Sequence, residues 1–395
     1  MTEPRQSVRA VAGMDAVGPA EWSALSVGCS LYSGPDWIRH ADRMTDSVPD
    51  HLILERDGRP VAALPGYRFP GARPFFYDLG PVLGLGKPAE ADDVPLHLAG
   101  TRLGYTGDVL TRALCAPAER ESAARALYAA FAERCRESGA RGAMLYVTDE
   151  SLAQLLPALG PSDRVVLVDA AARLAVPADG LDGYRRLFSR GRWDSFRREM
   201  RRFRDEGCET RVLALGENLP EMGALASQVS RRYGHDMSPE DETLKLREQA
   251  ERLGECVMLT AFRGEEMVGF TQFFLRDGTM YGRGHGVADA YGRRASIYFN
   301  LTYYEAVRWG AEHGLTHIDL GCDSLEAKVV RGGRLRPLWA VVAAPEWSAA
   351  EQATVREQER QRLRQYRGLD PEVVTPVVRA VAAREGWDAE EEADR

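Results

Sequence analysis

Residues 298–333 read YFNLTYYEAVRWGAEHGLTHIDLGCDSLEAKVVRGG and decide the fold. Together with the preceding residue they carry an apolar stripe at helical spacing, made of Ile297, Leu301, Tyr304, Val307 and Ala311. This spacing predicts an amphipathic helix that ends before Gly314, because glycine commonly follows the last turn of a helix. The apolar residues around Asp319 then predict a short strand.

The same order of helix, glycine and strand occurs once earlier, in residues 121–149. There the apolar stripe ends before Gly139 and consists of Ala124, Leu127, Tyr128, Phe131 and Cys135. Each copy follows an antiparallel pattern. Asp57-Gly58 marks a hairpin within residues 51–69, and turns at Gly264 and Asp277-Gly278 mark a three-stranded meander within residues 257–284. We interpret the repeat as a duplicated lobe of strands and helices.

The strand patterns also indicate where the lobes end. The run RVVLVDAAARLAV (164–176) is expected to close the first lobe, and RPLWAVVAA (336–344) the second. We therefore predict an α+β fold of two tandem lobes, each a mixed, mostly antiparallel sheet flanked by helices. The expected parts are a lobe over residues 1–175, a lobe over 176–345 and a helical tail over 346–395.

Composition excludes several classes of protein. The 395 residues are 44% hydrophobic with a net charge of −8, which is enough apolar material for a core and argues against disorder. We expect a cytoplasmic protein without a membrane span, because no long apolar run and no secretory signal are present. The six cysteines lack paired spacing, and His313 and His317 flank a glycine, so free thiols and no metal site are expected.

The charge is unevenly distributed along the chain. Residues 185–204 contain nine arginines and two acids, a local charge of +7 in an acidic protein. One interpretation is a solvated amphipathic helix with Phe196, Met200 and Phe203 facing inward. The other is a docking face for phosphates, either of a nucleotide cofactor or of an RNA backbone.

Taken together, these features resemble the GCN5-related N-acyltransferase (GNAT) superfamily in its duplicated form. That form includes the FemAB-like aminoacyltransferases and the BioF2-like acetyltransferase domain. The resemblance covers residues 20–345 and is strongest in residues 183–340. It rests on the basic helix FRREMRRFRDEG (196–207), on Ile318-Asp319-Leu320-Gly321, and on Lys328 with Gly332.

The resemblance implies an N-acyltransferase that moves an acyl or aminoacyl group from an activated donor to an amine. No permanently bound cofactor is implied. The expected co-substrate is acyl-CoA, with aminoacyl-tRNA as the alternative, and tRNA would use the Arg185–Arg204 region. The amine belongs to a small molecule or to a precursor of the cell wall or of a secondary metabolite. A catalytically silent GNAT-like protein that only binds a ligand is a further alternative.

The donor site is expected just before the helix that starts near Ile297. Single-lobe members hold donor phosphates there with the backbone amides of a glycine-containing loop. The matching residues are Gly292, Arg293, Arg294, Ala295 and Ser296, the last being suited to cap the helix. This loop departs from the usual motif, and a surface turn with two solvated arginines is the alternative. Arg331 is a further candidate for binding the donor and would extend the positive patch of Lys328.

Lys328, Asp323 and His285 are the catalytic candidates. Lys328 is one of only three lysines beside many arginines, and the resemblance implies an active-site lysine that holds a donor phosphate or steadies an oxyanion. Asp323 is the preferred acceptor of the amine proton, since Asp319 lies within the strand. His285 lies in Gly-Arg-Gly-His-Gly, where we expect the strand to bulge. Cys322 is a weaker candidate as a nucleophile, and an exposed lysine and a core histidine are the alternatives.

Aromatic and polar residues in both lobes are candidates for binding the acceptor. Tyr233 and His235 occupy an insert that often serves this purpose in the family, although a helix cap followed by a turn explains them too. In the first lobe, Tyr77 and Asp78 resemble the family's aromatic segments that line the groove between the lobes, as do Tyr32, Trp37 and Phe76. A plain core explains these first-lobe residues equally well.

Overall fold

The two ends of the chain build one structural unit, and its middle builds another. A computed structural model describes residues 6–71, 73–86, 94–292 and 294–387. The first unit comprises Met1–Ala171 and Leu335–Arg395, and the second comprises Ala172–Arg334. Each unit is described by itself below.

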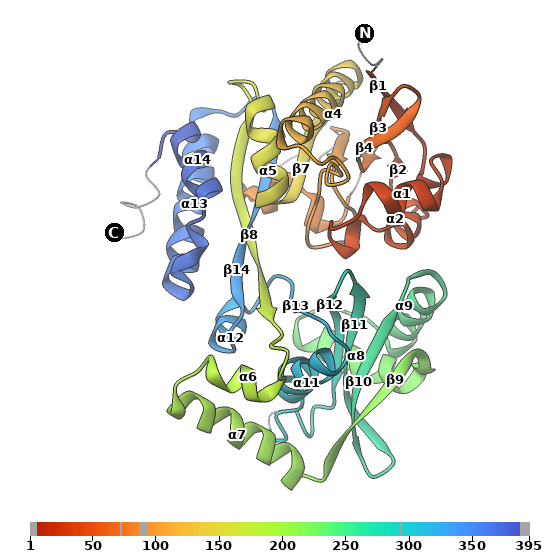
Figure 1. The fold of residues 1–395 in the computed structure, drawn as a ribbon, viewed down its shortest axis with the longest axis vertical. Coiled ribbons are helices and arrows are strands. Elements are labelled where there is room, and N and C mark those ends of the chain that lie inside the picture. Colours follow the sequence, from red (N-terminus) through yellow and green to blue (C-terminus); the bar gives the residue numbers. More distant parts are fainter. Residues whose placement is uncertain (1–5, 72, 87–93, 293, 388–395) are drawn as a thin grey trace. The chain divides into compact units, whose positions relative to one another are not determined.

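The first unit contains two sheets (Figure 1). One is antiparallel with the order β1-β3-β4, and the other has the order β2-β5-β6-β7-β14-β8. The strands are β1 (Gln6–Val11), β2 (Val48–Pro49), β3 (His51–Arg56), β4 (Arg59–Leu64), β5 (Gly66–Phe69), β6 (Leu96–Ala99), β7 (Arg141–Thr148), β8 (Arg164–Ala175) and β14 (Arg334–Ala343). The predicted hairpin is confirmed, because Asp57 and Gly58 join β3 to β4 with φ angles of 51° and 75°.

Helices cover these sheets. They are α1 (Pro19–Leu25), α2 (Pro35–Asp42), α3 (Leu79–Leu83), α4 (Pro117–Ser138), α5 (Asp149–Leu155), α13 (Ala349–Leu369) and α14 (Pro376–Glu385), with short 3₁₀ turns at Met14–Ala16, Leu31–Ser33, Phe75–Tyr77, Leu156–Ala158 and Pro371–Val373. The stripe predicted for residues 121–138 is buried along α4, and α4 ends before Gly139 at a φ of 65°. That helix was therefore predicted correctly from its periodicity.

The end of the chain differs from the predicted division. Strand β14 does not close the second lobe but pairs with β7 in the first unit, through Leu338 with Thr148 and Val341 with Met144. The expected separate tail also belongs to that unit, because the Glu359 carboxylate of α13 accepts a hydrogen bond from the Leu167 amide at 2.8 Å. An apolar pattern predicts a buried strand but not the sheet that the strand joins. The sequence therefore did not predict that β14 belongs to the first unit.

The second unit has the strand order β8-β13-β12-β11-β10-β9, with only the end of β8 taking part. The strands are β9 (Cys208–Asn218), β10 (Cys256–Arg263), β11 (Glu266–Arg276), β12 (Thr279–Val287) and β13 (His317–Asp319). The helices are α6 (Leu181–Arg186), α7 (Arg190–Asp205), α8 (Leu219–Arg232), α9 (Pro239–Arg252), α10 (Ile297–Phe299), α11 (Ala306–Glu312) and α12 (Leu325–Val330). The predicted meander is confirmed as β10, β11 and β12.

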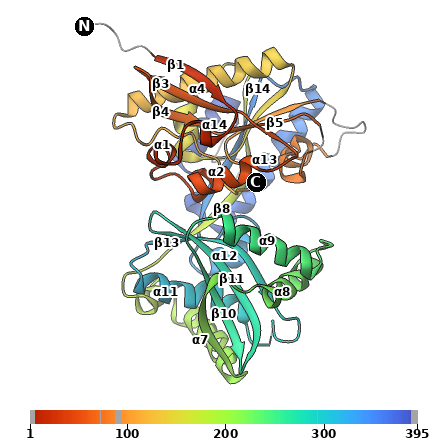
Figure 2. The same cartoon turned by 90° about the vertical axis from the view of Figure 1, so that its right-hand side faces the viewer.

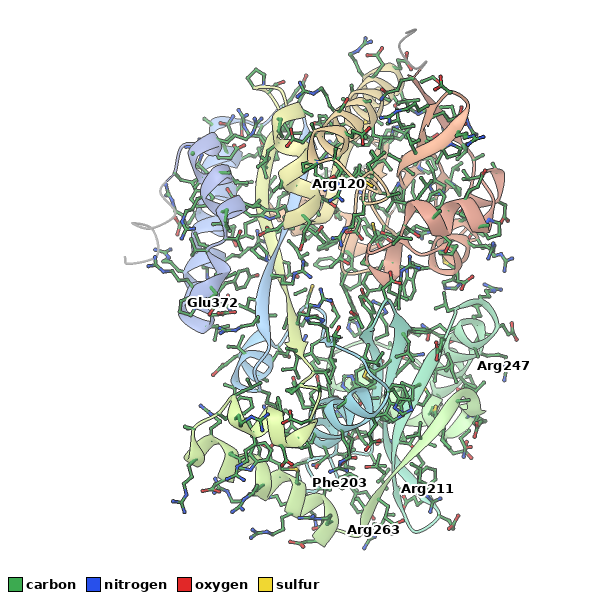
Figure 3. The ribbon with its side chains drawn as sticks, in the orientation of Figure 1. Arg120, Phe203, Arg211, Arg247, Arg263 and Glu372 are labelled. Atoms are coloured by element: carbon green, nitrogen blue, oxygen red, sulfur yellow. The ribbon has the colours of Figure 1, made fainter. Side chains whose placement is uncertain are left out.

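Helices lie on both faces of the second sheet. Figure 2 shows α8 and α9 on one side of β9–β12 and α7 and α11 on the other. Met222 and Leu225 of α8 pack with Met258 and Phe270 of the meander in one buried cluster. At the end of the meander the guanidinium carbon of Arg211 lies 4.3 Å from the centre of the Phe262 ring (Figure 3).

A π-helical segment and a bulge in β12 interrupt regular elements of the second unit. The helix predicted over residues 297–312 contains a π-helical segment at Asn300–Glu305, which periodicity alone does not reveal. In β12, Gly284 pairs with Gln272 and Gly282 with Phe273, so Arg283 is an extra residue and forms a bulge. The bulge expected in this glycine-rich run is thereby confirmed. Both irregularities lie beside the candidate site.

Candidate functional site

The candidate site lies in the second unit, at the end of the only short stretch where β12 and β13 pair. These strands run parallel, and their pairing covers Thr279–Tyr281 and His317–Asp319. Beyond it, β12 continues through the bulge to His285, whereas the chain leaves β13 for a loop at residues 320–324. The two parallel strands therefore stop pairing after Tyr281 and Asp319.

His285 is half-buried beside the aromatic ring of Tyr298, with 4.8 Å between the ring centres. Burial lowers the pKa of His285 to about 4, with the positive charges of Arg232 and Lys328 contributing in the same direction. The imidazole is therefore neutral at physiological pH. His285 and Tyr298 are thus in contact, and the charge of Lys328 acts on the same imidazole.

Gly286 brings helix α8 close to this region. A Cβ atom at Gly286 would lie 2.8 Å from the Ala226 amide nitrogen and 2.7 Å from the Leu225 Cβ, so only glycine allows this approach. At the end of α8, the amide of His235 donates to the Ser230 carbonyl at 3.0 Å and Gly234 has a φ of 79°. This is the helix cap that the sequence left open as an alternative for this segment.

The acceptor candidates on this turn are solvent-exposed. Tyr233 keeps 67% of its surface exposed, and His235 is exposed as well. Tyr233 also lies close enough to Tyr298 to help raise the pKa of that phenol, although burial is the main cause. These two side chains are accessible at the edge of the region that holds His285.

Lys328 is buried, with 5% of its surface exposed, and does not present its ammonium to solvent. Its Nζ donates to the Gly321 carbonyl at 3.0 Å and also to the Cys322 carbonyl. The expectation of an exposed lysine as the alternative is therefore wrong. Lys328 holds the loop that follows β13.

That loop separates the two predicted carboxylates. Asp319 is buried and its Oδ1 accepts a hydrogen bond from the Gly321 amide at 2.9 Å, which gives it a structural role. Asp323 is exposed and has a φ of 62°, followed by Ser324 at 47°. Two consecutive non-glycine residues in the left-handed region are unusual. Cys322 between the carboxylates is half-buried.

Arg331 is buried and does not extend a surface patch. Its Nη2 donates to the Glu199 carboxylate at 2.8 Å, and its guanidinium carbon lies 3.5 Å from the centre of the Phe299 ring. The Tyr304 hydroxyl donates to the same carboxylate. Sequence reasoning missed Glu199, although it is one of only two acids among the nine arginines of residues 185–204.

The predicted donor loop precedes α10 as expected but differs in its contacts. Arg294 is exposed and pairs with Glu206 at 2.5 Å. Ser296 is buried with a φ of 52°, and its side chain does not cap α10, so the predicted cap is wrong. Ala295 is buried and its amide donates to the Tyr291 carbonyl at 2.8 Å, while Gly292 is half-buried. The remaining predicted residue, Arg293, lies outside the described residues.

Tyr77 and Asp78 belong to the first unit and have partners there. The Tyr77 hydroxyl accepts a hydrogen bond from the Leu103 amide at 2.5 Å, and Asp78 caps α3 by accepting from the Gly80 amide at 3.2 Å. The rings of Tyr32 and Trp37 also pack edge to face, with centres 4.9 Å apart. The core interpretation accounts for these contacts.

The arginine-rich segment forms an exposed basic surface. All nine arginines of residues 185–204 are exposed, and we call them the arginine face; they are Arg185, Arg186, Arg190, Arg192, Arg197, Arg198, Arg201, Arg202 and Arg204. Phe196 and Phe203 of α7 are buried on the opposite side. The amphipathic helix is therefore confirmed, whatever the arginines bind.

Among residues 6–71, 73–86, 94–292 and 294–387, no group of three or more His, Cys, Asp or Glu side chains is placed to hold a metal ion. The six cysteines are free thiols. Within the same ranges, no helix is long and apolar enough to cross a membrane.

The expected α+β fold is confirmed, and the sequence matches a known protein family. The model of the FemAB-like family, whose description is peptidoglycan biosynthesis and recognition, matches residues 105–368. The chain belongs to that family. No curated protein matches the sequence.

Solved structures share the fold at low sequence identity. FemX is 11% identical, with a TM-score of 0.55 over 85% of this chain and 96% of its own. L-PGS from Bacillus licheniformis is 13% identical, with a TM-score of 0.50 over 86% of this chain and 96% of its own. A conserved protein of unknown function from Bacteroides thetaiotaomicron VPI-5482 is 13% identical, with a TM-score of 0.53 over 85% of this chain and 99% of its own.

Proposed function

We propose that this protein is an N-acyltransferase whose second unit transfers the acyl group of acyl-CoA to the amine of an acceptor molecule. The observation that carries the proposal is a neutral His285 that lies beside Tyr298 and feels the charge of Lys328, where β12 and β13 separate. Lys328 in turn holds the loop that carries Asp323. Membership in the FemAB-like family supports the reaction class. The acceptor we propose is the amine of a small molecule or of a precursor of the cell wall or a secondary metabolite.

The proposed reaction is a direct transfer. The amine nitrogen attacks the thioester carbonyl carbon, a C–N bond forms, and the C–S bond breaks. Asp323, an exposed carboxylate, accepts the proton that the amine loses, and the leaving thiolate takes up a proton. His285 is neutral and can donate or accept a hydrogen bond within the site without adding a buried charge.

The donor phosphates would meet the loop before α10. Arg294 at this loop is paired with Glu206, but the arginine is exposed and such surface pairs contribute little free energy. A phosphate group can therefore replace the Glu206 carboxylate at small cost. Arg293 and Ser296 remain predictions for contacts to the donor, whereas the amides of Gly292 and Ala295 already donate to the Ala288 and Tyr291 carbonyls. Tyr233 and His235 remain predictions for contacts to the acceptor.

Aminoacyl-tRNA is the alternative donor, and two observations favour it. The FemAB-like family match supports an aminoacyl group, and the arginine face supplies exposed positive charge for an RNA backbone. In that case the leaving group is the ribose hydroxyl of the tRNA instead of a thiol. Both donors are made in the cytoplasm, where we propose that the protein acts.

The test is to incubate the purified protein with acetyl-CoA or charged tRNA and a panel of amines. Thiol release and tRNA deacylation report the two donors separately. Asp323→Asn is expected to lower kcat by about 100-fold or more. Asp277→Asn is the matched control, since Asp277 also has a left-handed backbone, with a φ of 46°, in a hairpin turn. Absence of turnover with both donors would overturn the enzyme proposal, and retained ligand binding would then identify a binding protein.

A further inference from the structure

The environment of Lys328 points to a role that differs from binding the donor. Its ammonium is directed back at its own chain, towards the loop that follows β13. It donates to the Gly321 carbonyl at 3.0 Å and to the Cys322 carbonyl. Two of the three ammonium N–H bonds are therefore committed inside the protein, and only 5% of the residue is exposed.

The Gly321 carbonyl accepts hydrogen bonds from more than one part of the chain. It also accepts a hydrogen bond from the Ala172 amide at 3.0 Å, and the Leu320 amide donates to the Ala172 carbonyl at 2.8 Å. The Gly321 amide donates to Asp319. Gly321 is thus tied to strands β8 and β13, and Lys328 adds a tie to helix α12.

The next part of the loop adopts an uncommon backbone conformation. Asp323 and Ser324 have φ angles of 62° and 47°. Residues other than glycine, asparagine and aspartate rarely occupy this left-handed backbone region. Such conformations persist where the surrounding structure imposes them. The charge-assisted hydrogen bonds from Lys328 to the two preceding carbonyls are contacts of this kind.

We infer that Lys328 is a positioning residue, whose ammonium fixes the backbone of residues 321–324 so that the Asp323 carboxylate is presented at the site. The inference rests on the proposed function for the role of Asp323, and it reassigns Lys328 from contact with the donor to support of the loop. The backbone conformation of residues 321–324 can be measured independently of any enzymatic activity.

The kinetic test separates the two roles. Lys328→Met keeps an unbranched side chain but removes the N–H groups that donate hydrogen bonds, and Lys328→Arg keeps the positive charge. The expected result for Lys328→Met is a fall in kcat of about 100-fold with the donor KM unchanged within about threefold, because Asp323 is displaced while donor contacts remain. A rise in donor KM with unchanged kcat would overturn the inference.

A second substitution tests the backbone argument directly. Ser324→Gly in the Lys328→Met background lets residue 324 adopt a positive φ without strain. Recovery of kcat by about tenfold over Lys328→Met is expected if the lysine acts through the loop. Failure of glycine to recover any activity would show that the ammonium itself takes part in the reaction.

Cys322 provides a readout that needs no enzymatic activity. In a Cys115→Ser background, which removes the exposed thiol, Lys328→Met is expected to raise the reaction rate of Cys322 with a thiol reagent by about tenfold or more. Lys245→Met is the matched control, since Lys245 is an exposed lysine paired with Glu242 on helix α9.

The two readouts fail in different ways. If neither donor is turned over but Cys322 becomes reactive, the proposed function fails and the inference about the loop holds. An unchanged Cys322 rate in Lys328→Met overturns the inference whatever the activity. Should Lys328→Met not fold, Lys328→Gln, which keeps one shorter donor, is measured in the same assays with the same direction of change expected.

Discussion

The guanidinium of Arg331 and the carboxylate of Glu199 form a salt bridge of 2.8 Å inside the second unit. The residues are 132 positions apart and join helix α7 to the chain just after α12. The Tyr304 hydroxyl donates to Glu199, and the Phe299 ring stacks under Arg331. Helix α7, which carries seven of the nine arginines of the arginine face, is thus anchored on its inner side by one acid.

Glu199→Ala is expected to destabilise the protein by about 3 kcal/mol, because it leaves the Arg331 guanidinium buried without its counter-charge. Asp194→Ala is the matched control, since Asp194 is the other acid of the segment and its pair with Arg197 is largely exposed. Chemical denaturation of both variants measures the difference. Equal losses of stability would show that the buried pair carries no special weight.

Gly286→Ala is expected to destabilise the protein by about 2 kcal/mol. The added Cβ would come within 2.8 Å of the Ala226 amide nitrogen, and a helix backbone cannot move away as a side chain can. Gly191→Ala in α7 is the control, since nothing lies within 4 Å of the Cβ there, and it is expected to stabilise the helix by about 0.5 kcal/mol. Thermal unfolding compares them. A stable Gly286→Ala would mean that α8 can shift away from β12.

Glu359 is expected to make stability fall as pH rises. Burial raises the pKa of this carboxyl to about 8 and Glu385 adds to the rise, while Arg356, Arg362 and the hydrogen bond from Leu167 act against it. Because the folded pKa exceeds that of the unfolded chain, the folded state is penalised progressively from about pH 4.5 up to about pH 8, and the penalty is constant above that.

Glu359→Gln is therefore expected to gain stability relative to the wild type as pH rises from 5 to 8, by up to about 4 kcal/mol. The glutamine oxygen can still accept the hydrogen bond from the Leu167 amide. Denaturation across this pH range measures the gain. Glu357→Gln, which removes an exposed partner of Arg364 on the same helix, is the control. A gain that is the same at every pH would contradict ionisation of Glu359 as the cause.

The fold was predictable where local pattern decides it. The hairpin at Asp57-Gly58, the meander over β10–β12 and the stripe along α4 follow from turn chemistry and side-chain period, which neighbouring residues determine. The return of β14 to the first unit was not predictable, because strand pairing depends on residues distant in sequence. The π-helical segment at Asn300–Glu305 also adds a residue without changing the apolar pattern enough to be seen.

The site was predictable only in part, for a related reason. His285 and Lys328 do lie in one region. However, the hydrogen bonds that define the role of Lys328 run to backbone carbonyls, and the residue type does not predict which carbonyl a side chain contacts. Arg331 was expected at the surface as part of a positive patch, whereas its partner Glu199 lies far away along the chain. The buried or exposed state of a charged residue depends on such distant partners.

His285 is expected to titrate near pH 4, well below an ordinary imidazole. Because its folded pKa is lowered, protonation disfavours the folded state, so this residue contributes a loss of stability as pH falls from about 6.5 to about 4. Arg232→Ala is expected to raise the pKa, since it removes one positive charge near the ring. An NMR titration of the His285 ring measures the shift, with Arg231→Ala as the neighbouring control. An unchanged pKa in Arg232→Ala would assign the whole effect to burial and Lys328.

The arginine face distinguishes the two donors. Arg198→Gln with Arg202→Gln removes two exposed charges of the face, and Arg125→Gln with Arg136→Gln removes two exposed charges of α4. If charged tRNA is the donor, the first pair is expected to weaken tRNA binding and to reduce the slope of log affinity against log salt by roughly 2, because each phosphate contact adds about 0.9.

The second pair changes the net charge of the protein by the same amount but lies outside the arginine face, so it should leave both tRNA quantities unchanged. If acyl-CoA is the donor and the arginine face only solvates α7, neither pair changes the donor KM. Binding measured at several salt concentrations, beside acyl-CoA kinetics, therefore separates a local RNA contact from a general charge effect. A loss of acyl-CoA activity confined to the first pair would instead place the face at the CoA phosphates.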